Sequence, residues 1–105
     1  MNINEEKKEL KGSDVDQTLF ADYMLEWLET VKPSTELITY ISYTNAVKKR
    51  IAPYFSEKGI TLQELKPHHI QEFYNYALNE WKVKANTVIH YHANIRSALH
   101  QVYIT

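Results

Sequence analysis

Three histidines lie within residues 82–103, and two of them, His90 and His92, are separated by a single tyrosine. Such a pattern suggests three kinds of chemistry: a metal site, a catalytic base, or a surface that meets a polyanion. On a helix, positions i and i+2 point about 200° apart, so these two imidazoles cannot bind one ion together. His92 falls on an apolar stripe, which favours a hydrogen-bonded histidine in the core or at its boundary. His90 falls on the outer, polar face.

The residues needed for catalysis or for a metal site do not assemble elsewhere. The chain has no cysteine, which excludes disulfides, thiolate catalysis and cysteine-ligated zinc. His68 and His69 are adjacent, and neighbours on a helix point about 100° apart, so they do not form a ligand pair. The sequence contains no H-E-x-x-H, no G-x-S-x-G and no Gly-rich phosphate loop. We therefore expect no catalytic residue, no metal, no cofactor and no small-molecule substrate.

Charge is distributed unevenly along the chain. The formal net charge of −1 over 105 residues argues by itself against a nucleic-acid-binding protein. Residues 32–60, however, hold five basic and two acidic side chains, and residues 81–105 hold three basic and no acidic ones. A local patch matters more than the total for binding a polyanion. No apolar run approaches the ~20 residues of a membrane span, so no membrane partner is expected and the default location is cytoplasmic.

Apolar residues recur at steps of three and four in four segments, residues 18–33, 34–59, 62–81 and 82–103, as is typical of helices. We predict an all-α, four-helix domain over residues 17–105, preceded by a flexible N-terminal tail at residues 1–16. In the second segment the predicted core side is formed by Leu37, Ile41, Ala46 or Val47, Ile51 and Phe55. In the fourth it is formed by Val88, His92, Ile95, Leu99 and Val102, with Tyr91 and Ala98 beside it.

Local signals predict where these helices begin and end. The candidate N-terminal caps are Asp16 or Thr18, Ser34 or Thr35, and Asn86 or Thr87 for the first, second and fourth helices. Pro67 suits the first turn of the third helix. Pro53 lies inside a helical pattern and predicts a kink or a last turn there. Gly59 is expected to end the second unit.

The order of these features resembles a known family. The motifs that carry the resemblance are L-F-A-D-Y-M-L-E-W-L-E, then T-x-x-x-Y from Thr39 to Tyr43, I-x-P-Y-F from Ile51, L-x-x-L-K-P-x-x-I-x-x-F from Leu62, and K-A-N-T-V from Lys84 followed by I-R-S-A-L. Over residues 17–103 the chain resembles the N-terminal core-binding, SAM-like domain of phage and transposon integrases, the tyrosine recombinases. No single motif is specific, whereas the ordered set is.

This resemblance implies a fragment that binds duplex DNA for integration and recombination without catalysing either. In the family a second domain carries the two arginines, a lysine, a His-x-x-Arg element and a nucleophilic tyrosine. This chain has only Arg50 and Arg96, and the nearest approach to His-x-x-Arg, His92 to Arg96, is one residue too long. The resemblance further implies a bacterial or phage-encoded parent that is tetrameric on DNA. We expect the isolated domain to be a monomer.

The resemblance places the second and fourth helices against DNA, and these are the two positively charged segments. The predicted DNA-contacting residues are Thr39, Ser42, Asn45, Lys48, Lys49, Arg50, Lys82, Lys84, Asn86, Thr87, His90 and Asn94. Lysines would contact phosphates, and the uncharged side chains would contact bases or phosphates. Tyr43 and Tyr91 are expected to pack. The competing hypothesis is a helical protein–protein interaction domain, which a large exposed apolar patch would favour.

Overall fold

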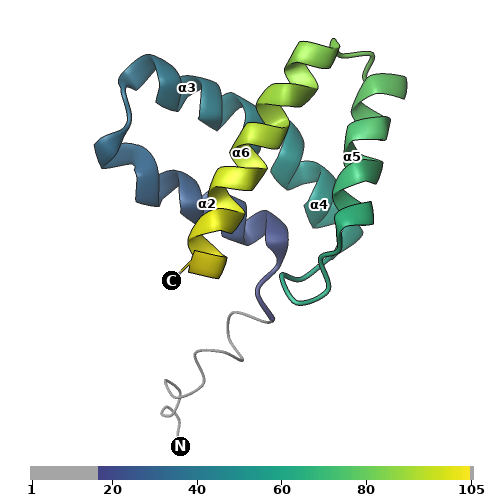
Figure 1. Ribbon diagram of the computed structural model, residues 1–105, viewed down its shortest axis with the longest axis horizontal. Coiled ribbons are helices and arrows are strands. Elements are labelled where there is room, and N and C mark those ends of the chain that lie inside the picture. Colours follow the sequence, from purple (N-terminus) through teal and green to yellow (C-terminus); the bar gives the residue numbers. More distant parts are fainter. Residues whose placement is uncertain (1–16, 105) are drawn as a thin grey trace, which may run out of the picture.

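The structure is a computed structural model that describes the backbone of residues 17–104 and the side chains of residues 17–100. Its helices are α2 (Phe20–Val31), the short η2 (Lys32–Ser34), α3 (Leu37–Ala46), the π-helical turn η3 (Val47–Ile51), α4 (Ala52–Lys58), α5 (Pro67–Asn79) and α6 (Ala85–Ile104). The described residues include no strand beyond one isolated bridge. Since α3, η3 and α4 follow one another without a break, the predicted all-α domain of four helices is confirmed (Figure 1). The predicted tail, residues 1–16, lies outside the described residues.

The second helix passes Pro53 by widening one turn. Proline has no N–H to donate to the carbonyl four residues back, and its ring crowds that carbonyl. The chain forms the π turn η3 immediately before the proline, and the Ala52 N–H donates to the Val47 carbonyl five residues back. Pro53 then stands at the start of α4. The predicted irregularity is therefore real, but it falls N-terminal to Pro53 and the helix continues to Lys58.

Backbone contacts and local turns begin and end the helices more often than the predicted caps do. α2 begins after Leu19 without a side-chain cap, so the prediction for Thr18 is wrong, and Asp16 lies outside the described residues. The Phe20 N–H donates instead to the Ile60 carbonyl at 2.9 Å, and the Leu62 N–H to the Thr18 carbonyl at 2.8 Å. This antiparallel bridge anchors the start of α2 to the α4–α5 connection.

The caps predicted for the second and fourth helices are also wrong. Ser34 and Thr35 donate backwards to the Val31 carbonyl, at 3.3 and 2.6 Å, and so finish α2, while α3 starts after Glu36 without a side-chain cap. α6 starts at Ala85, which leaves Asn86 and Thr87 inside its first turn. The prediction for Gly59 holds, because it ends α4 in the left-handed region with φ of 67°.

Pro67 is the first residue of α5, as its sequence position predicts. The orphan N–H of Lys66 donates to Nδ1 of His69 at 2.9 Å, so a histidine here does what Glu or Gln does in a capping box. The rings of His68 and His69 lie 4.2 Å apart, closer than their predicted angular separation implies. His69 therefore has a structural role at this helix start.

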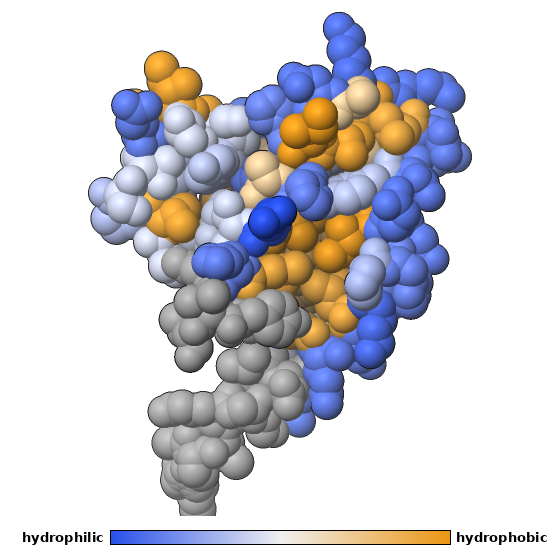
Figure 2. Space-filling model, in the orientation of Figure 1, coloured by the Kyte–Doolittle hydropathy of each residue, from blue (hydrophilic) through white to orange (hydrophobic). Residues whose placement is uncertain are grey.

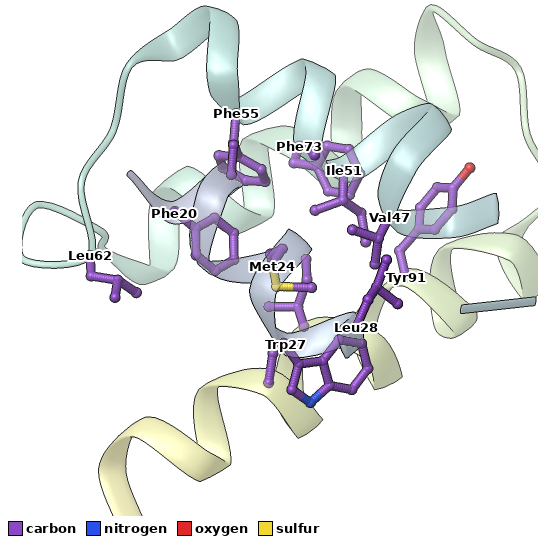
Figure 3. Close-up of a cluster of buried hydrophobic side chains, with 14 of the residues drawn as sticks. Phe20, Met24, Trp27, Leu28, Val47, Ile51, Phe55, Leu62, Phe73 and Tyr91 are labelled. Atoms are coloured by element: carbon purple, nitrogen blue, oxygen red, sulfur yellow. The ribbon is translucent and has the colours of Figure 1, made fainter. Parts of the chain in front are cut away.

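Aromatic rings fill the space between α2, α4 and α5. Phe20 and Phe55 meet edge to face at 4.9 Å, and Phe73 lies 5.4 Å from Phe55. All three are fully buried, together with Met24 and Leu28 (Figure 3). Phe20, Met24 and Leu28 recur at steps of four within the first predicted helix, so burial of this stripe follows from the helical periodicity of the sequence.

α6 is rotated relative to its predicted orientation. Its buried residues are Tyr91, Asn94, Ile95 and Ala98. His92, predicted on the core side, is exposed and its Nδ1 is 2.9 Å from the Tyr74 hydroxyl. The histidine is hydrogen-bonded as expected, but it lies at the rim of the core. The reason is the ring of Tyr91, which packs 5.4 Å from Phe73 and takes the place that the prediction gave to His92.

The N-terminal half of α3 departs from prediction as well. Leu37 and Ile41, both predicted to face the core, are 72% and 49% exposed. Ile38 beside them is 82% exposed. The N-terminal half contributes to the core through the partly buried Tyr40, and the C-terminal half through Tyr43, whose ring lies 5.4 Å from Trp27. The apolar positions near the helix start are thus left uncovered within the part of the chain that the structure describes.

Candidate nucleic-acid interface

The outer face of the second helix carries the first group of predicted contact residues. Val47 and Ile51 are fully buried, and this fixes how the helix is rotated about its axis. Ser42, Asn45 and Lys49 are consequently exposed along one side, as predicted. Thr39 is only half-buried and lies at the edge of that side.

Lys48 and Arg50 leave the π turn in different directions. Lys48 lines a hollow of about 260 Å³ together with Asp22 and Leu25, which places it toward α2. Arg50 instead lies over the ring of Trp81, with its guanidinium carbon 4.4 Å from the ring centroid. Three consecutive basic residues therefore point toward α2, outward and toward the α5–α6 connection. They do not form a single cluster.

The α5–α6 connection carries two more predicted contact residues. Lys82 has φ of 59°, a left-handed conformation that helix ends usually give to glycine. The next residue, Val83, donates its N–H to the Ala77 carbonyl at 3.2 Å. The Lys82 ammonium donates to the Asn79 carbonyl at 3.0 Å and so sits at the negative end of the α5 dipole. Lys84 is exposed directly before α6.

The first turns of α6 hold the remaining predicted contacts. Asn86 and His90 are exposed and pair with each other, Nδ2 to Nε2, at 3.4 Å, while Thr87 is half-buried. Asn94 was predicted on the outer face, and that placement is wrong: it is 4% exposed. Its Nδ2 donates to the His90 carbonyl at 2.8 Å, and its Oδ1 has no hydrogen-bond partner among the described residues. The rotation of α6 that buries Tyr91 also turns Asn94 inward.

Arg50 brings the two positively charged segments together. α6 crosses the second helix near the π turn (Figure 1), and η3 and α6 are in contact. Burial raises the pKa of Tyr91, and the positive charge of Arg50 acts in the opposite direction, which places the guanidinium near that phenol too. Within residues 17–100, none of the lysines and arginines pairs with a carboxylate at ion-pair distance. No carboxylate in that range therefore neutralises their charge.

Sequence reasoning missed the role of Trp81. Its apolar character and helical spacing assigned it to the core stripe of α5, and its ring does pack 5.8 Å from Phe73 and 5.3 Å from Tyr76. The same ring also receives Arg50. The sequence does not indicate that Arg50 lies over Trp81, because the two residues are far apart along the chain.

A groove of about 650 Å³ lies between α5 and α6, away from the basic residues described above. Leu65, Ile70 and Leu99 contribute to its apolar lining, and Lys66, Arg96 and His100 contribute charge or polarity. Figure 2 shows apolar surface in the region between these two helices. Tyr74 also lines the groove, and burial raises its pKa to about 12. The Tyr74 hydroxyl therefore stays protonated and hydrogen-bonded to His92 near neutral pH.

Two further kinds of site do not occur within the described residues. No three side chains of the His, Cys, Asp or Glu type come together there as metal ligands would. None of the helices in that part of the chain combines the length and the apolar character needed to cross a bilayer. The basic surface and the α5–α6 groove are thus the features that a function has to explain.

Comparison with known proteins gives the family. The family model described as "Phage integrase, N-terminal SAM-like domain" matches residues 19–78, which is more than half of the chain. The chain belongs to this family of integrase N-terminal domains. The match runs from the start of α2 into the last turn of α5 and ends before α6. Searches of curated proteins and of solved structures each give no match.

Proposed function

We propose that this chain is the core-binding domain of a tyrosine recombinase and that it holds duplex DNA against the outer face of α3 and η3 and the start of α6. The observation that carries the proposal is the stacking of Arg50 on Trp81, which joins the two positively charged segments. Family membership supports it independently. Catalysis would belong to a further domain, and the parent would act as a tetramer on its DNA.

The proposed contacts divide by chemistry. Lys49 and Lys84 are exposed and free to neutralise phosphates, which positions the protein without reading sequence. Ser42 and Asn45 share the exposed side of Lys49 and offer hydrogen bonds to base edges or to phosphates. Lys48, on the α2 side, and the buried Asn94 are placed less favourably for contact than the sequence suggested.

The test is binding of a labelled duplex of ~20–30 bp, followed by fluorescence anisotropy across a salt series. Each phosphate contact contributes about −0.9 to the slope of log K against log salt, so three or four contacts give roughly −3 to −4. Affinity should lie in the non-specific range of ~10⁻⁴ to 10⁻⁶ M at physiological salt. Lys49→Ala should weaken binding to every sequence and reduce the slope by about one.

Lys58→Ala is the matched control for this experiment. It removes the same charge, but Lys58 lies in the last turn of α4, over the Tyr54 ring. Its binding and slope should match those of the wild-type domain. Equal effects of the two substitutions would mean that net charge alone matters and that the proposed face is wrong. Folded protein that fails to bind at ~50 mM salt would refute DNA binding by this domain, since non-specific contacts are strongest at low salt.

A second candidate function is docking of a protein partner, and the apolar groove between α5 and α6 favours it. Leu37, Ile38 and Ile41 add a second uncovered apolar area. Exposed apolar patches of this kind commonly mark interaction surfaces. Arg96→Glu changes the charge of the groove and lies outside the proposed DNA face. A variant that loses DNA affinity as strongly as Lys49→Ala would count against a separate role for the groove.

A further inference from the structure

Arg50 differs from its two basic neighbours in how it is held. Lys48 and Lys49 are exposed, whereas Arg50 is half-buried, with its flat guanidinium 4.4 Å from the centroid of the Trp81 ring. A guanidinium that stacks on an indole face gains cation–π attraction and packing at once. Arg50 is thus the basic residue of the π turn whose position is most strongly fixed by the protein itself.

Trp81 is fixed in turn by the core. Its ring meets Tyr76 at 5.3 Å, Phe73 at 5.8 Å and Tyr54 at 6.4 Å, each close to edge to face. The residue stands between the last turn of α5 and Lys82, whose left-handed backbone starts the connection to α6. Anything that holds Trp81 therefore also holds the connection that carries Lys82 and Lys84.

We propose that Trp81, although uncharged, is a positioning residue for DNA binding: by stacking under Arg50 it fixes the α5–α6 connection against the π turn. Lys49 and Lys84 then form one preorganised surface. This inference rests on the proposed DNA-binding function. Without the stacking of Arg50 on Trp81, the π turn and the α5–α6 connection would have to become ordered when DNA binds. The free-energy cost of that ordering would weaken binding.

The proposal separates Arg50 from a simple phosphate ligand. A phosphate ligand acts through its charge, so an uncharged residue in its place would lower the salt slope by about one, whereas lysine would keep the slope. In the positioning role proposed here, Arg50 acts through its flat stacking surface, which lysine does not reproduce. Substituting Trp81 removes no charge at all, so its effect on DNA binding isolates the positioning role.

The experiment measures duplex affinity across a salt series for Trp81→Leu, for Arg50→Lys and for the double variant. Each single variant should bind roughly three- to tenfold more weakly with an unchanged salt slope, the range expected for losing a cation–π contact. The double variant should bind no more weakly than the weaker single variant, because both changes break the same contact. Circular dichroism establishes that each variant is folded, and Arg50→Lys leaves the ring cluster intact should Trp81→Leu unfold.

A coupling measurement distinguishes positioning from a general loss of stability. Lys84→Ala should reduce DNA affinity clearly in the wild-type background and less in the Arg50→Lys background. In the latter, the α5–α6 connection is no longer fixed by the stack, so Lys84 already contributes less to binding. A purely structural role would leave the cost of Lys84→Ala equal in both backgrounds. If the wild-type domain binds DNA and both Trp81→Leu and Arg50→Lys bind it with the same affinity, this inference is overturned and the proposed function stands. Absence of binding by the folded wild-type domain would overturn both.

Discussion

Two interfaces of the domain are built differently. Between α2, α4 and α5 the contacts are apolar and largely aromatic, with Phe20, Phe55 and Phe73 fully buried. α6 is held by mixed contacts. The Tyr23 hydroxyl donates to the Ala98 carbonyl at 2.6 Å, the Tyr74 hydroxyl meets His92, and the buried Asn94 has one oxygen without a partner among the described residues.

The difference shows how stability and function are divided. An apolar aromatic core is stabilised mainly by the area it buries and by close packing. Polar contacts are directional, and they hold α6 in the rotation that the packing of Tyr91 sets. We therefore expect substitutions in the first interface to change stability most, and those in the second to change it less and in either direction.

The largest effect is expected for Phe55→Ala in the aromatic interface. Phe55 is fully buried and its ring contacts Phe20, Tyr54 and Phe73. Truncation should lower the free energy of unfolding by about 3–5 kcal/mol, a large part of the total for a domain of this size. Urea denaturation measures it, with Ser56→Ala, an exposed neighbour, as the control that should change little. A loss as small as ~1 kcal/mol would show that the cluster is loosely packed.

An effect of opposite sign is expected for Asn94→Leu in the α6 interface. The carbonyl that Asn94 Nδ2 contacts, that of His90, lies within the same helix and is one turn away, so losing this donor costs little. The unpaired buried Oδ1 is removed at the same time, and the free energy of unfolding should rise by about 1–2 kcal/mol. Asn75→Leu, at an exposed position of α5, is the control. Destabilisation by Asn94→Leu would mean that Oδ1 has a partner that matters for α6.

The smallest effect concerns the link between Tyr74 and His92. Burial raises the pKa of Tyr74 from 10.0 to about 12, so the folded state holds the phenol proton more tightly than the unfolded chain does. The stability that this preference contributes is complete below pH 10 and is lost as pH rises toward 12. The stability difference between wild type and Tyr74→Phe, followed by urea denaturation, should shrink over that interval. A difference that is constant with pH would show that the phenol is freely solvated.

Much of the fold follows from local patterns. The four helices, the left-handed Gly59 and the position of Pro67 at the start of α5 agree with their predictions. Helix caps were predicted poorly: Ser34 and Thr35 donate backwards to the Val31 carbonyl and so finish the preceding helix, and the start of α2 is held by backbone bonds to Ile60 and Leu62, which only the folded chain brings near. The exposed line of Ser42, Asn45 and Lys49 was predicted correctly, since the buried Val47 and Ile51 belong to the same helix.

By itself, the sequence determined which segments are helical, which face of α2 and α5 is buried, and where positive charge is concentrated. Those properties depend on residue spacing along one helix, so neighbours in the chain suffice to fix them. Only the tertiary structure decided that α6 turns Asn94 inward and that Trp81 receives Arg50. Each of these depends on how large rings from different helices share one volume. Close packing permits few such arrangements, and the spacing of residues along one helix does not specify which of them is adopted.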